Sequence, residues 1–206
     1  PDTTSKKNVG DLKKLATGAG TIFIGVIIGS ALTYLFNIFV ARQLGAHQFG
    51  LFSLSLNTIN TLAIICLLGM NTALIRYVAI FKGAYQYDRI KATIQSVFCL
   101  VIPASVVMAV FLFLKADAIS VFLFNKPQLG EALKILSVGI PFMNFSTVLV
   151  FSIQGMSILK YRVYIKNLLE PAGRFIFGIV FIFMGWQLYG VLVAYLMTLI
   201  ISSCIA

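Results

Sequence analysis

The stretch FVARQLGAHQFGLFSLS, residues Phe39 to Ser55, separates two long apolar segments of the sequence. Its polar part is short and contains Arg42, His47 and two glycines, Gly45 and Gly50. Glycines between two regular segments are typical of a tight reversal of the chain. If the flanking segments are membrane helices, this stretch is the tip of a helical hairpin.

The composition of the chain indicates a membrane protein. Of its 206 residues, 60% are hydrophobic and 11% are charged, and the mean hydropathy is +0.98. Soluble domains average about 25% charged residues, so a chain this apolar needs a bilayer as its second solvent. The net charge of +10 would suggest a nucleic-acid partner for a soluble protein. Because the basic residues lie between apolar segments, we expect them to set the topology instead, with no nucleic-acid partner.

The uncharged segments predict an all-α protein with six transmembrane helices, each of the roughly 20 residues that span a bilayer. The last uncharged segment, Phe175 to Ala206, is too long for one span. We expect it to divide at GWQLYG, Gly185 to Gly190, where two glycines flank the interfacial residues Trp186 and Tyr189. A basic segment, 1–14, precedes the six-helix lobe 15–206, whose helices are expected at about 15–41, 49–70, 92–114, 128–159, 168–184 and 191–206, the last truncated.

The basic residues divide unequally between alternate loops. Twelve of the 16 fall in the N-terminal segment and in the second and fourth loops, whereas four fall in the first and third. The positive-inside rule therefore predicts a cytoplasmic N-terminus. The larger group is Lys6, Lys7, Lys13, Lys14, Arg76, Lys82, Arg89, Lys91, Lys160, Arg162, Lys166 and Arg174, and the smaller group is Arg42, Lys115, Lys126 and Lys134.

One segment, Ala118 to Lys134, fits none of the predicted spans. Its apolar run is too short to cross a bilayer, so we expect it to lie in the outer interface. Asn125 or Lys126 would cap the fourth helix, with Pro127 in its first turn and Glu131 near its positive end.

Small and polar side chains follow three of the predicted helices at helical spacing. They allow two interpretations: close packing between helices, or the lining of a water-accessible path. Pro103 and Pro141 are expected to kink the third and fourth helices, a feature of alternating and static bundles alike. The polar and small residues are Gly25, Gly29, Thr33 and Asn37, then Ser53, Asn57, Asn60 and Thr61, and finally Asn144, Thr147 and Gln154.

The charged and reactive residues give no support for an enzyme. All six acidic residues are expected at helix ends or in loops, and no motif for catalysis, a metal or a cofactor is present in the sequence. We interpret His47 as a plain loop residue, and Cys66, Cys99 and Cys204 as structural. Arg76 and Arg174 are either snorkelling anchors or inward-facing cations for an anionic ligand.

The segment that begins with the opening stretch resembles the N-terminal signature of the oligosaccharide flippases of polysaccharide biosynthesis. These belong to the multidrug/oligosaccharidyl-lipid/polysaccharide exporter superfamily. The matching positions are Ala41-Arg42-Gln43-Leu44-Gly45, Phe49-Gly50-Leu51-Phe52 and Gly69 to Tyr77, and more loosely Gln154-Gly155, Lys160–Lys166, Pro171, Arg174 and the hairpin before the sixth helix.

The resemblance implies a transporter of two six-helix lobes in the cytoplasmic membrane, of which this chain would be the N-terminal lobe. It implies export of a polyprenyl-diphosphate-linked oligosaccharide by alternating access, so the partners are that lipid-linked glycan, the bilayer and the C-terminal lobe. On this basis Arg76, together with Arg174, would bind the diphosphate or an acidic sugar. The residues expected to contact sugar hydroxyls are Asn37, Asn57, Asn60, Asn144 and Gln154.

Three other functions stay open. Multidrug and toxin extrusion transporters share the implied fold but commonly use a membrane-embedded carboxylate, and we expect none within these spans. Peptidoglycan-precursor flippases carry basic residues along the first helix, whereas residues 34–40 are uncharged. A membrane scaffold in an envelope-synthesis complex needs no transport at all, and reconstituted flipping would distinguish it.

Overall fold

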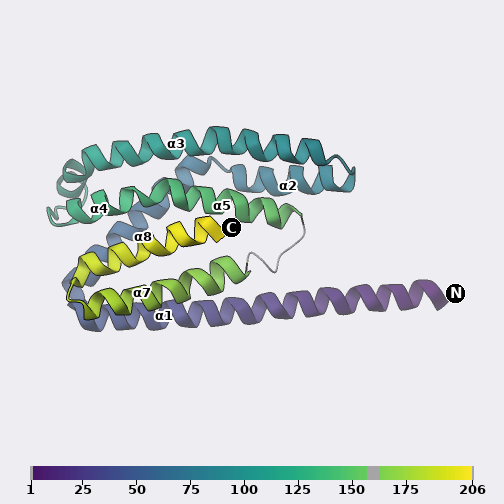
Figure 1. The fold of residues 1–206 in the computed structure, drawn as a ribbon, viewed down its shortest axis with the longest axis horizontal. Coiled ribbons are helices and arrows are strands. Elements are labelled where there is room, and N and C mark those ends of the chain that lie inside the picture. The colour runs from purple at the N-terminus through teal and green to yellow at the C-terminus, as the bar shows by residue number, and fades with distance from the viewer. Residues whose placement is uncertain (1, 157–162, 206) are drawn as a thin grey trace.

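A computed structural model describes residues 2–156 and 163–205, and all the regular structure in these ranges is helical (Figure 1). Lys160 and Arg162, two of the basic residues used to predict the topology, lie outside the described residues. The elements are α1 (Asp2–Leu67), α2 (Met70–Gly83), α3 (Tyr87–Phe122), α4 (Leu129–Ser137), α5 (Gly139–Gly155), the π-helix η1 (Val163–Leu169), α7 (Glu170–Phe183) and α8 (Gln187–Ile205).

The hairpin predicted from the opening stretch is present, because α1 consists of two arms that meet at Gly45. This residue has non-helical angles, φ 77° and ψ 168°, which glycine adopts without a Cβ clash. The second arm ends at Leu67, and α2 begins after Gly69, which is left-handed with φ 73°. The second predicted helix therefore continues past residue 70 to Gly83, with a break where the sequence predicted its end.

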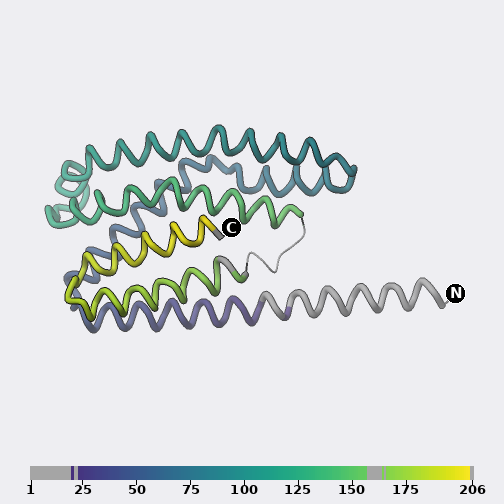
Figure 2. The backbone as a smooth tube through the Cα atoms, in the orientation of Figure 1, coloured from purple at the N-terminus to yellow at the C-terminus, as the bar shows by residue number. Residues whose placement is uncertain are grey.

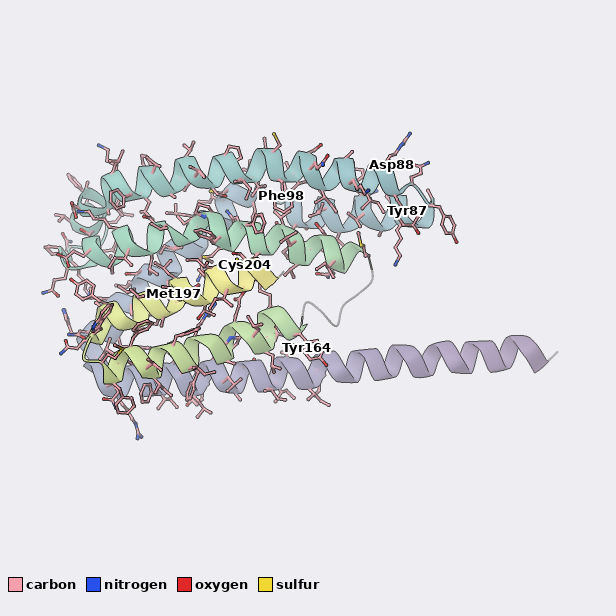
Figure 3. All side chains as sticks on the ribbon, viewed as in Figure 1. Tyr87, Asp88, Phe98, Tyr164, Met197 and Cys204 are labelled. Carbon is pink, nitrogen blue, oxygen red and sulfur yellow. The ribbon has the colours of Figure 1, made fainter. Side chains whose placement is uncertain are left out.

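The turns between the helical rods gather at two ends of the bundle. One end, which we call the turn end, holds the reversal between the two arms of α1, the loop 123–128 between α3 and α4, and the turn between α7 and α8 (Figures 1 and 2, left). Tyr87 and Asp88, labelled in Figure 3, mark the opposite end at the start of α3. The first, third and fifth predicted loops thus share one end of the bundle, whereas the side that faces the cytoplasm stays a prediction.

The segment predicted to lie in the outer interface is part of α3 instead. Residues 118–122 form its end. The helix continues past the charged residues Lys115 and Asp117 because buried positions recur at i+4 spacing, at Leu112, Ala116 and Ser120. Neither Asn125 nor Lys126 caps the next helix: α4 begins after Gln128, with no side-chain cap and with Pro127 outside its first turn. Glu131 does lie in that first turn, as expected.

The kink predicted at Pro141 is present as a break between α4 and α5. The two helices meet at Val138 and are bent by 46°. A proline ring clashes with the carbonyl four residues earlier, here that of Ser137, and removes one helical hydrogen bond, so the break falls just before the proline. By contrast, α3 continues as one helix through Pro103.

Within the described ranges, three helical stretches are long and apolar enough to cross a membrane, and the bent pair α4–α5 makes a fourth. The first stretch, Phe23–Leu67, contains both arms of α1. The described helices form six rods. They are the first arm of α1, the second arm of α1 with α2, α3, the bent pair α4–α5, η1 with α7, and α8. Their core packs both arms of α1 against α4, α5 and α8 through residues such as Phe36, Phe52, Leu136, Ile140 and Leu192.

Candidate functional site

A polar cavity of about 330 Å³ lies between the two arms of α1 and the helices α7 and α8. We call it the α1–α7 cavity. Four of the seven residues predicted to bind substrate line it, namely Asn37, Asn57, Asn60 and Arg174. Its other lining residues are Thr33, Phe36, Phe49, Phe52, Ser53, Leu56 and Tyr195.

The two arms of α1 present polar side chains to this cavity from consecutive turns. On the first arm, Thr33 and Asn37 are four residues apart and therefore lie on one face. The Thr33 hydroxyl donates to the Gly29 carbonyl at 2.8 Å, which satisfies it within the helix. On the second arm, Asn57 and Asn60 are exposed, so their carboxamides are free of the core packing. The cavity therefore offers several amide donors and acceptors.

Arg174 supplies the cationic group of the cavity. Its Nη2 donates to Glu170 Oε2 at 3.1 Å, and its guanidinium lies 4.4 Å from the centroid of the Tyr195 ring. Its Nε is buried and has no hydrogen-bond partner within the part of the chain that the structure describes. The planar guanidinium is thus fixed in place by a carboxylate and an aromatic ring, and one of its donors is unused.

Glu170 is buried, with 4% of its surface exposed, and its carboxylate lies between two cations. Its Oε1 is 2.7 Å from Lys166 Nζ and accepts a hydrogen bond from the Ser202 hydroxyl at 3.1 Å. Glu170 lies in the first turn of α7, which directly follows η1, so it is at a helix end as predicted. The burial of its side chain was not predicted from the sequence. The three side chains together carry one net positive charge.

Lys166 lines a second cavity, of about 350 Å³, between the first arm of α1 and η1. We call it the α1–η1 cavity, and it shares Thr33 and Asn37 with the α1–α7 cavity. The carboxylate of Glu170 thus holds one cation beside each of two adjoining cavities. The described η1 segment is a π-helix, a conformation frequent at functional sites.

The other three predicted residues do not line either cavity. Asn144 is 1% exposed, and its Nδ2 donates to the Ser105 hydroxyl on α3 at 2.7 Å, so the packing interpretation fits it. Arg76 is exposed on α2, and Gln154 is half-buried near the end of α5.

Sequence reasoning missed the roles of Lys166, Glu170 and Tyr195. The signal for two of them was the spacing Lys166, Glu170, Arg174, since residues four apart on a helix can form ion pairs. This spacing predicts ion pairs along one face of a helix, but it does not predict that the cluster is buried. Nothing in the sequence indicates that Tyr195 packs against Arg174.

Comparisons with known proteins place this geometry in context. A family model described as "Polysaccharide biosynthesis protein" matches residues 15–206. The fold resembles that of a solved structure entitled "Outward-facing conformation of a multidrug resistance MATE family transporter of the MOP superfamily", with a TM-score of 0.77 and 18% sequence identity. The match covers 88% of this chain and 42% of that one, so the chain spans less than half of that transporter's length. No curated protein matches at a significant level. The fold is therefore a polytopic, all-α membrane fold.

Proposed function

Because the chain belongs to the polysaccharide biosynthesis protein family, we propose that the full-length protein exports a polyprenyl-diphosphate-linked oligosaccharide across the membrane by alternating access. The observation that carries the proposal is the α1–α7 cavity, where a cation is grouped with three asparagines. A lipid-linked oligosaccharide presents the matching chemistry, an anionic diphosphate followed by sugar hydroxyls.

We assign the diphosphate to Arg174 and Lys166, and not to Arg76 as the sequence suggested. Arginine forms bidentate hydrogen bonds to phosphate oxygens, and lysine provides a compact point charge. The carboxamides of Asn37, Asn57 and Asn60 would donate to and accept from sugar hydroxyls. The polyprenyl chain would stay in the bilayer. In this proposal the protein is in the cytoplasmic membrane, with the N-terminus in the cytoplasm and the turn end outside.

The test is reconstituted flipping. The full-length protein is placed in liposomes with a fluorescent polyprenyl-diphosphate oligosaccharide, and the label that becomes accessible to an external quencher is followed in time. We expect the protein to accelerate this exposure above that of empty liposomes. A properly folded protein that leaves the rate unchanged would show that the proposed function, and with it the transport mechanism, is wrong.

Two matched substitutions test the assignment of the cavity. Asn57→Leu removes an exposed carboxamide from the cavity and is expected to lower the flipping rate about fivefold, since a neutral hydrogen bond contributes ~1 kcal/mol. Asn144→Leu makes the same chemical change at the buried contact with Ser105 and is expected to leave the rate unchanged. Equal effects of the two variants on the rate, at equal protein levels, would contradict the placement of the substrate between the arms of α1.

One observation favours a second candidate, a cation-coupled exporter of small molecules. Glu170 is a buried carboxylate, and the solved structure with a similar fold is a multidrug resistance transporter. Under this alternative, vesicles containing the full-length protein would expel ethidium when a proton or sodium gradient is applied, and Glu170→Gln would abolish that efflux. Efflux of ethidium without flipping of the labelled glycan would favour this candidate over the first.

A further inference from the structure

A second polar cavity, of about 560 Å³, lies at the turn end. We call it the turn-end cavity. The three turns that gather there each contribute to it: the segment after Gly45, the loop before α4 and the beginning of α8. Its lining residues are His47, Gln48, Leu51, Pro127, Gln128, Glu131, Gln187, Leu188 and Tyr189.

The side chains of this cavity differ in chemistry from those of the α1–α7 cavity. Three are carboxamides, and the others that are polar are an imidazole, a phenol and one carboxylate. Lysine and arginine are absent from the described lining, which disfavours an anionic ligand. The apolar lining residues are Leu51, which is buried, Leu188, which is half-buried, and Pro127, which is exposed. The cavity thus combines mostly uncharged donors and acceptors with some apolar surface.

Hydrogen bonds between these side chains connect the three turns. His47 Nε2 donates to Gln128 Oε1 at 2.7 Å, and Gln48 Nε2 donates to Gln187 Oε1 at 3.4 Å. The Tyr189 hydroxyl donates to a carboxylate oxygen of Glu131. These hydrogen bonds bring residues distant in sequence together around the cavity, and a site that is partly formed before binding lowers the entropic cost of binding.

We propose that the turn-end cavity is a binding site for neutral saccharides. A sugar ring presents vicinal hydroxyls that donate and accept at once, and carboxamide, imidazole and carboxylate groups pair with such hydroxyls. The opposite faces of a sugar ring are C–H surfaces, which match the apolar side chains in the lining, Leu188 and Pro127. The choice of saccharide as the ligand rests on the proposed function, which puts the glycan outside, where the turn end is predicted to lie. The site then receives the sugars of the exported glycan as they leave the bundle.

The experiment is saturation-transfer NMR on the full-length protein in phospholipid nanodiscs. The probes are glucose, galactose and N-acetylglucosamine, with glucose 6-phosphate as the anionic counterpart. The test variant is Gln128→Leu/Gln187→Leu, and the control is Gln86→Leu, an exposed glutamine at the opposite end of the bundle, before α3. Thermal unfolding checks that each protein is folded, and the single variants Gln128→Ala and Gln187→Ala replace the double variant if it does not fold.

We expect at least one neutral sugar to give a signal in the unmodified protein and in Gln86→Leu. In the double variant its affinity should fall at least about tenfold, because two hydrogen-bonding side chains are lost. No signal from any neutral sugar, an unchanged signal in the double variant and its single-residue replacements, or a stronger signal from glucose 6-phosphate would each overturn the proposal.

Flipping measured on the same preparations separates this proposal from the proposed function. If the protein flips the labelled glycan but binds no neutral sugar at the turn end, only the proposal of the turn-end site is wrong. If the protein binds the sugar at Gln128 and Gln187 but flips no glycan, the turn-end site is supported and the proposed export is wrong.

Discussion

Replacing Glu170 with glutamine is expected to destabilise the protein by about 3–5 kcal/mol, the usual cost of removing one partner from a buried ion pair. The carboxylate lies between Lys166 and Arg174, at 2.7 Å and 3.1 Å, and is 4% exposed. Without it, two like charges remain partly buried beside each other. The measurement is the unfolding midpoint of the full-length protein in detergent, followed by loss of helical circular dichroism.

Asp117→Asn is the matched control, because it also removes a carboxylate from an ion pair. The side chain of Asp117 is 69% exposed, and its oxygen lies 2.6 Å from Lys134 Nζ. Exposed pairs contribute about 0–1 kcal/mol, so we expect little change in the unfolding midpoint. If both substitutions lower the midpoint equally, burial is not what makes Glu170 important.

A triple variant separates the charges from the packing. Lys166→Met, Glu170→Leu and Arg174→Met together remove the cluster, and replacing a buried ionic group by apolar residues of similar size is often neutral for stability. We expect the triple variant to recover most of the stability lost in Glu170→Gln but to flip no glycan. Flipping by a stable triple variant would remove both cations from the proposed mechanism.

Gly29→Ala is expected to separate the first arm of α1 from η1. A Cβ at residue 29 would lie 2.0 Å from the Asn167 backbone oxygen, which is far inside van der Waals contact. Overpacking of this kind typically costs about 1–3 kcal/mol, and here the opposing atom is backbone, which cannot move aside as a flexible side chain can. We expect a lower unfolding midpoint and a lower flipping rate, since Thr33 and Asn37 lie on the same arm as Gly29.

Gly20→Ala is the corresponding control on the same helix. A Cβ at residue 20 would have no heavy atom within 4 Å among those described. Alanine favours helix over glycine by about 1 kcal/mol, so this variant should be as stable as the unmodified protein or slightly more so. A similar loss of stability in both variants would mean that the contact with Asn167 does not explain the result at Gly29.

The fold was predictable where local chemistry decides it. Gly45 and Pro141 act on the backbone of their own segment, so the reversal and the bend could be located without knowing the neighbouring helices. The ends of helices were less predictable. Charged residues such as Lys115 and Asp117 suggested an end of α3 near residue 114, but the helix continues because Ala116 and Ser120 are buried against neighbouring helices.

The candidate site was predictable to the extent that it depends on helical spacing. Asn37, Asn57 and Asn60 line one cavity, as expected for polar residues that recur on one face of each arm. Asn144 follows the same rule yet is buried against Ser105, because the sequence does not show which neighbour a polar face meets. The burial of Glu170 was missed for the same reason: a charged side chain near the start of a helix can point either to solvent or to the interior.

Thr33 and Asn37 border both cavities, and this has a kinetic consequence for the proposed cargo. Lys166 and Arg174 contact the two oxygens of the same Glu170 carboxylate, at 2.7 Å and 3.1 Å, so their cationic groups lie close together. A diphosphate that moves between the two cavities can contact the second cation before it leaves the first, while Thr33 and Asn37 add hydrogen bonds, so it need not shed all of its polar contacts on the way. We therefore expect a low barrier and a short residence at each step, as transport requires, in contrast to the slow release from a single deep site.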